Sequence, residues 1–171
     1  MHQKLINSLY ISFIIILISF SVRSAEELKS IGKFKDWETF TVIENDNKIC
    51  FAQSIPILRA PKKFERNPSR LFVSFRPTED IKDEVSATSG YTFQKEKIVK
   101  AKSGKKTFDF FAQENFAWIL DTEEEQKFIQ AMKKASRVMI IGRTDKGKQT
   151  IDHYSLMGFS KAYNTAKKNC S

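Results

Sequence analysis

Short stretches of the chain alternate between hydrophobic and polar residues and are separated by turn residues, a pattern that predicts β-strands. Successive side chains of a strand point to opposite faces, so a strand with one buried face shows a period of two residues. Aromatic and β-branched residues, which favour strands, are concentrated in these stretches. The predicted strands cover residues 34–42, 49–55, 71–75, 85–87, 91–93, 98–101, 107–111, 116–120, 138–141 and 150–156.

The connections between these strands carry turn and loop signals. Ser103-Gly104-Lys105-Lys106 predicts a hairpin turn between two of the strands. Residues 59–69 contain two prolines and several basic residues, and they predict a loop.

The pattern changes to a helical period at Thr122. Phe128, Ala131, Met132 and Ala135 recur at spacings of three and four residues and predict one amphipathic helix. Thr122 and Glu125 have the spacing of a capping box at its start, and glutamates occupy its first turn. A second helix is predicted over residues 160–169.

These elements predict a mainly β fold. The strands do not alternate with helices, which excludes repeated βαβ units and favours an antiparallel β-sandwich with one interior and one C-terminal helix. We find no internal repeat or low-complexity linker, so residues 25–171 are predicted to form a single domain.

The first two dozen residues have the pattern of a secretory signal peptide. Lys4 precedes an apolar run over residues 5–20, and small residues follow it up to Ala25. We expect residues 1–24 to be removed by cleavage after Ser24, which leaves a mature form without a membrane span. Cleavage after Ala25 and an uncleaved anchor are the alternatives, although the run is shorter than the about 20 residues that a membrane helix needs.

Two cysteines, Cys50 and Cys170, are present in the chain. A lone pair of cysteines in an exported protein most simply forms a disulfide. The alternative is two buried free thiols. No C-x-x-C motif is present, so a redox-active pair is not indicated.

The chain is basic, with a formal net charge of +9. In an exported protein the natural polyanions are lipid headgroups and anionic glycans rather than nucleic acid. The candidate residues for binding such a surface are Lys97, Lys100, Lys102, Lys105 and Lys106. Lys100, Lys102 and Lys106 share one face if the strand runs unbroken. The alternative is an ordinary solvated sheet face whose charge keeps the domain soluble.

Catalysis is not indicated by the sequence. After removal of the leader one histidine, His153, remains, and in a strand it points away from its neighbour Asp152. A catalytic triad requires the histidine to contact both a nucleophile and an orienting carboxylate. We therefore expect no enzyme activity, no catalytic residue, no metal site and no cofactor.

Several segments together resemble the invasion-associated locus B family of exported bacterial proteins. They are GKFKDW at 32–37, CFAQS at 50–54, the pairs at 85–86, 90–91 and 117–118, AMKK at 131–134, GRT at 142–144 and DHYSLMGF at 152–159. The resemblance implies an immunoglobulin-like β-sandwich in the periplasm or cell envelope, with a disulfide and no cofactor. It supplies no catalytic residues.

The functional expectation is a non-catalytic envelope or periplasmic protein with a binding or structural role. Its partner would be an envelope protein, an anionic glycan or a lipid, and the binding would support host-cell association or invasion. The alternatives are a periplasmic chaperone that uses an exposed sheet edge, and an enzyme centred on His153.

The first prediction concerns the leader. Expression in a bacterial host with an intact secretion pathway is expected to yield a periplasmic protein whose first residue is Ala25, because Val22 and Ser24 are small residues at the positions that signal peptidase reads. Intact-mass measurement of the fractionated protein checks this. A membrane-bound product of full mass would establish the uncleaved anchor instead.

Overall fold

The computed structural model describes residues 27–171, and the predicted signal peptide at residues 1–24 lies outside the described residues. The strands are β1 (Lys29–Phe34), β2 (Trp37–Glu44), β3 (Asn47–Ser54), β4 (Leu58–Ala60), β5 (Arg70–Arg76), β6 (Ile81–Thr88), β7 (Val99–Ser103), β8 (Lys106–Gln113), β9 (Phe116–Trp118), β10 (Arg137–Arg143) and β11 (Gln149–Ser155). The helices are a short 3-10 turn η1 (Pro77–Glu79), α1 (Thr122–Lys134) and α2 (Phe159–Asn169).

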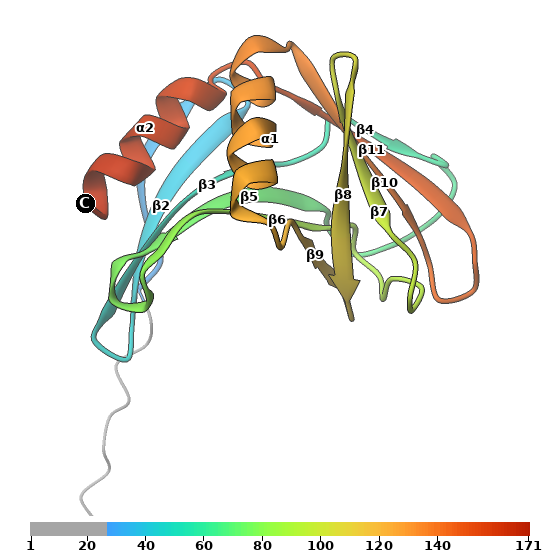
Figure 1. Cartoon of the computed structure of the whole chain (residues 1–171), viewed down its shortest axis with the longest axis horizontal. Helices are drawn as coiled ribbons and strands as arrows, with labels where there is room; N and C mark the ends of the chain where they lie inside the picture. The colour runs from blue at the N-terminus through green and yellow to red at the C-terminus, as the bar shows by residue number, and fades with distance from the viewer. Residues whose placement is uncertain (1–26) are drawn as a thin grey trace, which may run out of the picture.

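The strands of the described residues form one open antiparallel sheet in the order β1-β2-β3-β5-β6-β9-β8-β7-β10-β11-β4. The two halves of this sheet make the layers of a β-sandwich-like fold, so the predicted mainly β class with one interior and one C-terminal helix is confirmed (Figure 1).

The two layers are joined by hydrogen-bonded strands. Residues 106–110 of β8 pair with β7, whereas residues 111–113 of the same strand pair with β9. On the other side of the fold, β3 ends in one layer at Ser54 and the chain enters β4 of the other layer at Leu58. A strand that passes from one layer to the other bends the sheet, which is how sandwich corners are commonly built.

Three details differ from the predicted strands. Residues 91–93 form no strand, and Phe93 makes only an isolated bridge with Thr144. The segment predicted as one strand over residues 34–42 is a hairpin, because Lys35 adopts a left-handed φ of 55° and reverses the chain between β1 and β2. The loop predicted over residues 59–69 begins inside β4, a three-residue edge strand that pairs with β11. An edge strand bonds on one side only, so neighbouring prolines are compatible with it.

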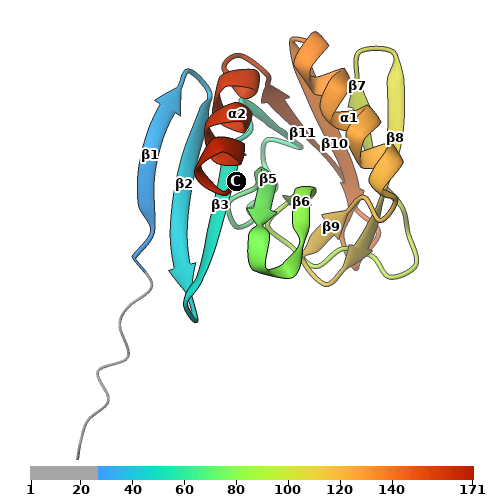
Figure 2. The ribbon, with the colours of Figure 1, turned by 60° about the vertical axis from the view of Figure 1, so that its left-hand side comes forward.

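Both helices pack on the same side of the sheet, α2 against β2 and β3, and α1 against β6, β7 and β8 (Figure 2). Their buried residues recur at three- and four-residue spacings and meet the buried positions of the strands. Trp37 lies at the centre of this core, 4.8 Å between ring centroids from Phe159, and its indole nitrogen donates to the Ser155 carbonyl oxygen at 2.9 Å. Trp37 is therefore a core residue.

The predicted capping box at the start of α1 does not form. The cap is Asp121, one residue earlier, whose carboxylate accepts from the Glu124 backbone N–H at 2.8 Å. Glu125 points inward, is 7% exposed, and accepts from the Val85 backbone N–H of β6 at 2.5 Å. Burial, together with the nearby charges of Glu84 and Asp83, raises the pKa of the Glu125 carboxyl to about 7.

The second prediction is that the free energy of unfolding falls as pH rises through the titration of Glu125. The folded state holds the pKa of Glu125 at about 7, above its ordinary value of 4.5, so stability is lost as pH rises from about 4.5 to about 7, by about 3 kcal/mol in total. Glu125→Gln retains an acceptor for Val85 without a charge, and its stability is expected to exceed that of the wild type at about pH 8 and to match it at about pH 4. Urea unfolding at both pH values measures this.

The matched control is Glu124→Gln, which removes an exposed carboxylate from the same turn. Identical pH slopes for the wild type and Glu125→Gln would contradict the assignment of this titration to Glu125.

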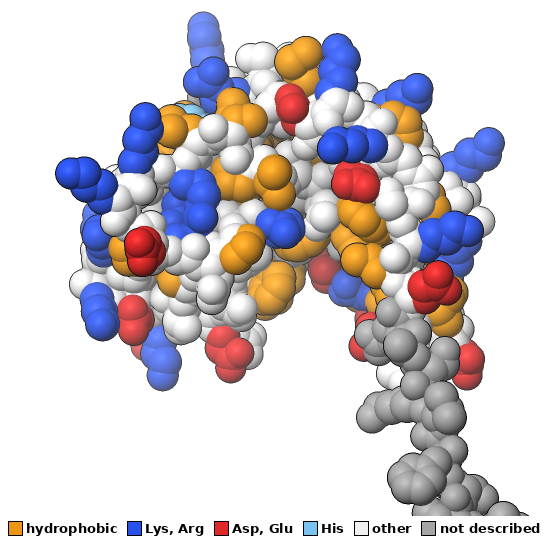
Figure 3. All heavy atoms as spheres, turned by 180° about the vertical axis from the view of Figure 1, so that it is seen from behind, with side chains coloured by type: hydrophobic (Ala, Val, Ile, Leu, Met, Phe, Trp, Pro, Cys, Tyr) orange, Lys and Arg blue, Asp and Glu red, His pale blue; other side chains and the backbone are white. Residues whose placement is uncertain are grey.

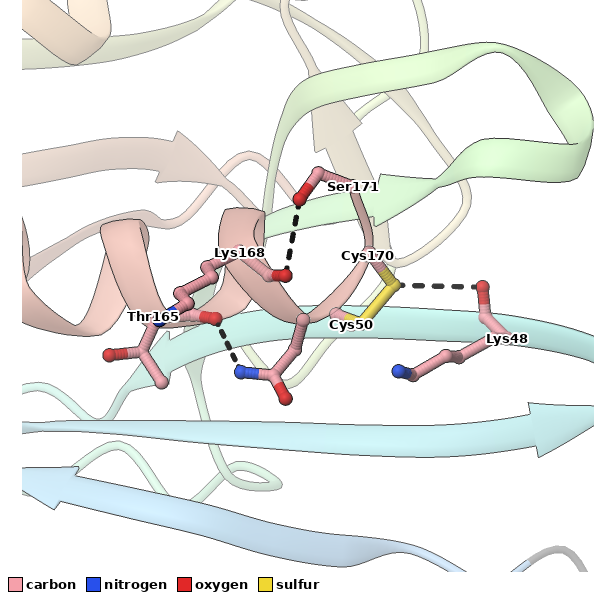
Figure 4. The surroundings of a disulfide bond; sticks show 7 residues. Lys48, Cys50, Thr165, Lys168, Cys170 and Ser171 are labelled. Atoms are coloured by element: carbon pink, nitrogen blue, oxygen red, sulfur yellow. Dashed lines mark hydrogen bonds between the residues drawn. A yellow bond between two sulfur atoms is a disulfide. The ribbon is translucent and has the colours of Figure 1, made fainter.

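A disulfide joins Cys50 of β3 to Cys170 at the end of α2, with a separation of 120 residues (Figure 4). The predicted pairing is confirmed. The bond holds the last turn of α2 against the central strand of the first layer, where Cys50 is fully buried. It closes a loop that includes every element from β4 to α2 and leaves β1 and β2 outside.

The third prediction follows from the length of that loop. In the chain-entropy model a closure of this size stabilises the folded state by at most about 5 kcal/mol. Cys50→Ala/Cys170→Ser is expected to lower the free energy of unfolding by about 3–5 kcal/mol, as measured by urea unfolding under non-reducing conditions. The wild type unfolded in reducing agent is the control, and a stability unchanged by either treatment would contradict the prediction.

Candidate functional site

The five candidate lysines do not share one face of the sheet. Lys100 and Lys102 alternate with buried residues of β7 and point away from the helices, and Lys100 is paired with Asp109 at 2.9 Å. The chain then turns at Gly104, which has a φ of 60°, and Lys106 pairs with the buried Ser103. Lys105 and Lys106 therefore lie beside α1, on the other face. The strand is interrupted at Gly104, so Lys106 does not share a face with Lys100 and Lys102.

Lys97 lies apart from both groups. It is exposed in the connection between Phe93 and β7, where its backbone N–H donates to Gln94. The structure thus distributes the predicted lysines over three locations and leaves their role in binding a proposal.

Lys105 and Lys106 line a groove between the β7–β8 hairpin and α1, with a volume of about 580 Å³. We call it the lysine groove, and its lining residues are Ser103, Gly104, Lys105, Lys106, Glu123, Gln126, Lys127, Gln130, Ala131, Lys134 and Ala135. The helix presents these residues at three- and four-residue spacings, so Lys127 and Lys134 face the hairpin lysines. The sequence analysis did not identify this second pair.

The segment around His153 does not assemble a catalytic arrangement. Asp152 points into the core and His153 to the other face of β11, as strand alternation predicts. No hydrogen bond joins His153 to Asp152 or Ser155 within residues 27–171, and the Ser155 hydroxyl accepts instead from the Met157 backbone N–H at 3.2 Å.

Asp152 is the acceptor of a buried ion pair. Its carboxylate receives two hydrogen bonds from the Arg66 guanidinium, at 2.5 and 2.8 Å, and the two side chains are 0% and 1% exposed. Arg66 also donates to the Ser89 carbonyl oxygen at 2.6 Å and to the Ser69 hydroxyl at 3.0 Å. The pair anchors the long loop after β4 to β11, which is a structural role.

The helix-free side of the sheet carries a second feature, a set of aromatic side chains. One row crosses β5, β6, β9 and β8, where paired positions bring Phe72, Ser86, Trp118 and Phe111 side by side. A neighbouring row pairs Phe40 with Phe51, whose rings stack with 5.4 Å between centroids. We call the surface formed by Phe40, Phe51, Phe72, Phe111, Phe116 and Trp118 the aromatic face.

The aromatic face is open to solvent. Phe111 is 47% exposed, and the other five rings are half-buried. A hollow of about 520 Å³ lies over Phe51, Phe72, Phe116 and Trp118. The molecule is hollowed between two lobes, and hydrophobic side chains border that hollow (Figure 3).

Polar groups at one end of this hollow are already paired. Arg76 donates to Glu84 at 2.7 Å and to Glu79 at 3.1 Å, and Ser74 and Ser86 provide hydroxyls between the rings. These contacts raise the pKa of Arg76 while its partial burial opposes the rise. The hollow is thus an apolar surface with few polar groups, the composition typical of a binding site.

Sequence reasoning did not find the aromatic face. Trp118 lies on the helix-free side of the sheet, with its ring centroid 5.8 Å from that of Phe116. The period-two pattern shows that one face of a strand is apolar, but β5 and β9 carry apolar side chains on both faces, and only the position of the helices decides which face stays open.

Within residues 27–171, no helix is long and apolar enough to cross a membrane. No group of three or more His, Cys, Asp or Glu side chains in that part of the chain is placed to hold a metal ion.

No protein-family model matches the chain, and no curated protein matches it. Among solved structures, the crystal structure of invasion associated protein B from Bartonella henselae matches 82% of this chain and 96% of its own, with a TM-score of 0.57. The two chains share a fold. Their sequences are 12% identical, so the likeness extends to the architecture and leaves the function of this chain to be argued from its surfaces.

Proposed function

We propose that this chain is an exported, non-catalytic protein of the periplasm or cell envelope that acts by binding another protein through its aromatic face. The observation that carries the proposal is the cluster of one exposed and five half-buried rings on the helix-free side of the sheet. Exposed apolar patches of this kind typically mark interaction sites. Aromatic residues are also the commonest residues at the energetic centre of protein interfaces.

Three other findings support the location and the kind of activity. The leader pattern indicates export, and the Cys50–Cys170 bond suits an oxidising compartment. The fold is shared with a protein named for invasion, which is consistent with membership of the invasion-associated locus B family. Host-cell association is the biological setting that we propose for this binding.

The chaperone alternative depends on an open sheet edge. The edges of the described sheet are β1 and β4. β4 has three residues, and β1 carries Lys29 and Lys33. Short or charged edge strands are poor templates for capturing another strand, so the aromatic face is the better-supported surface.

The fourth prediction tests this surface. The oxidised mature domain is expected to capture a specific protein from native envelope fractions at both low and high salt, because contacts with aromatic rings are not screened. Phe72→Ser/Trp118→Ser is expected to weaken that capture by about 1,000-fold, since interface residues at the energetic centre contribute about 2 kcal/mol or more each and two are removed. Titration of the isolated partner measures the change.

The matched control is Ile55→Ser/Ile57→Ser, which removes two apolar side chains that are 60% and 57% exposed and lie outside the aromatic face. Thermal unfolding confirms that both variants are folded. Equal capture by the wild type and by Phe72→Ser/Trp118→Ser would refute the proposal.

A further inference from the structure

The lysine groove is a separate site with its own charge. Its lining residues include Lys105 and Lys106 from the hairpin and Lys127 and Lys134 from α1, against the single carboxylate of Glu123. Lys127 is paired with Glu123 at 2.8 Å and with Glu124 at 3.0 Å. These pairs raise the pKa of Lys127 and keep its ammonium group charged.

The other three lysines of the groove are unpaired. Lys105, Lys106 and Lys134 are exposed and form no ion pair within the described part of the chain, residues 27–171. An ammonium group is a compact point charge that binds phosphate oxygens from several directions. Three such groups around one hollow therefore favour a compact ligand with several negative oxygens over an extended chain, which would need a continuous basic track.

A buried polar group of the groove also lacks a partner. Ser103 lines the groove and is 3% exposed, and its hydroxyl has no hydrogen-bond partner among the described residues. A buried hydroxyl normally finds one. The Ser103 hydroxyl, a hydrogen-bond donor without a partner, therefore lies in the same groove as the three unpaired ammonium groups.

Charge is divided between the two ends of the domain. The β7–β8 turn lies at one end, and the β2–β3 and β5–β6 connections lie at the opposite end (Figures 1 and 2). Those two connections carry four exposed carboxylates, Glu44, Asp46, Glu79 and Asp80, of which Glu79 is paired with Arg76 and Asp80 with Lys82. Most of the acidic side chains in Figure 3 accordingly lie in its lower half. An anionic surface attracts the end with the lysine groove and repels the other end, which sets one orientation.

We propose that the lysine groove docks the domain on an anionic membrane surface by holding a phosphorylated lipid headgroup between the β7–β8 hairpin and α1. This inference uses the exported location of the proposed function and is independent of the aromatic face. In the docked orientation the acidic connections point away from the membrane. The groove itself is open, so a headgroup reaches it without a conformational change.

The experiment is a co-sedimentation assay of the mature, oxidised protein with two kinds of vesicle, phosphatidylcholine alone and phosphatidylcholine mixed with phosphatidic acid, whose headgroup is a terminal phosphate, in equal parts. Binding is expected only to the mixed vesicles and is expected to weaken with salt. Each basic residue near an anionic surface contributes about a fivefold change in affinity. Lys105→Ala/Lys106→Ala/Lys134→Ala is therefore expected to bind about 100-fold more weakly.

The control is Lys62→Ala/Lys63→Ala/Lys95→Ala, which removes the same charge from exposed positions outside the groove and is expected to bind within about fivefold of the wild type. Thermal unfolding shows whether each variant is folded. An equal loss of vesicle affinity in the two triple variants would show that the groove is not the binding site and would indicate diffuse charge attraction. Binding to heparin without binding to mixed vesicles would overturn the lipid and assign the groove to a sulfated glycan.

The membrane assay and the capture assay fail independently. Loss of protein capture in Phe72→Ser/Trp118→Ser with normal vesicle binding leaves the groove inference intact. Wild-type protein that captures a partner but does not bind the mixed vesicles removes the groove inference and leaves the aromatic face as the proposed partner surface.

Discussion

The buried ion pair between Arg66 and Asp152 holds together segments that no local interaction connects. Arg66 belongs to the loop after β4, Asp152 to β11 and Ser89, whose carbonyl it also contacts, to the turn after β6. Both charged side chains are buried. Removal of one partner would leave the other charge buried and unpaired, which costs about 3–5 kcal/mol. The pair therefore fixes the path of the loop and the position of β11 opposite the first layer. The two faces of the sheet are defined by this arrangement.

One face of the sheet is covered and the other is not, and the functional argument depends on this difference. The disulfide and the indole of Trp37 hold α2 and the end of β11 in place, and Glu125 holds α1 to β6. With both helices on one side, the rings on the other side have no covering element among the described residues. The same placement of α1 beside the β7–β8 hairpin forms the lysine groove. The packing of both helices on one side of the sheet thus produces two surfaces with different chemistry.

The sequence predicted the elements better than it predicted the site. The helix at Thr122, the hairpin turn at Gly104 and the Cys50–Cys170 pair all have local or compositional signals, and all are present. Lys35 has no turn signature, because a lysine with a positive φ is set by tertiary contacts such as the bond from the Asp36 N–H to the Met157 carbonyl oxygen. Glu125 has the spacing of a capping residue, yet a strand remote in sequence provides its partner.

The sequence by itself determined the strand and helix periods, the basic charge, the leader pattern and the two cysteines, because each is a property of composition or of neighbouring residues. Tertiary structure alone decided which lysines meet and which apolar face stays open. Lys106 lies on the opposite face from Lys102 because the chain reverses at Gly104, and Lys134 joins it because α1 packs there. The aromatic face exists because β6 pairs with β9, a strand distant in the chain, which places Phe72 of β5 in one row with Trp118 and Phe111. Register of this kind depends on pairing between distant segments, which no local pattern encodes.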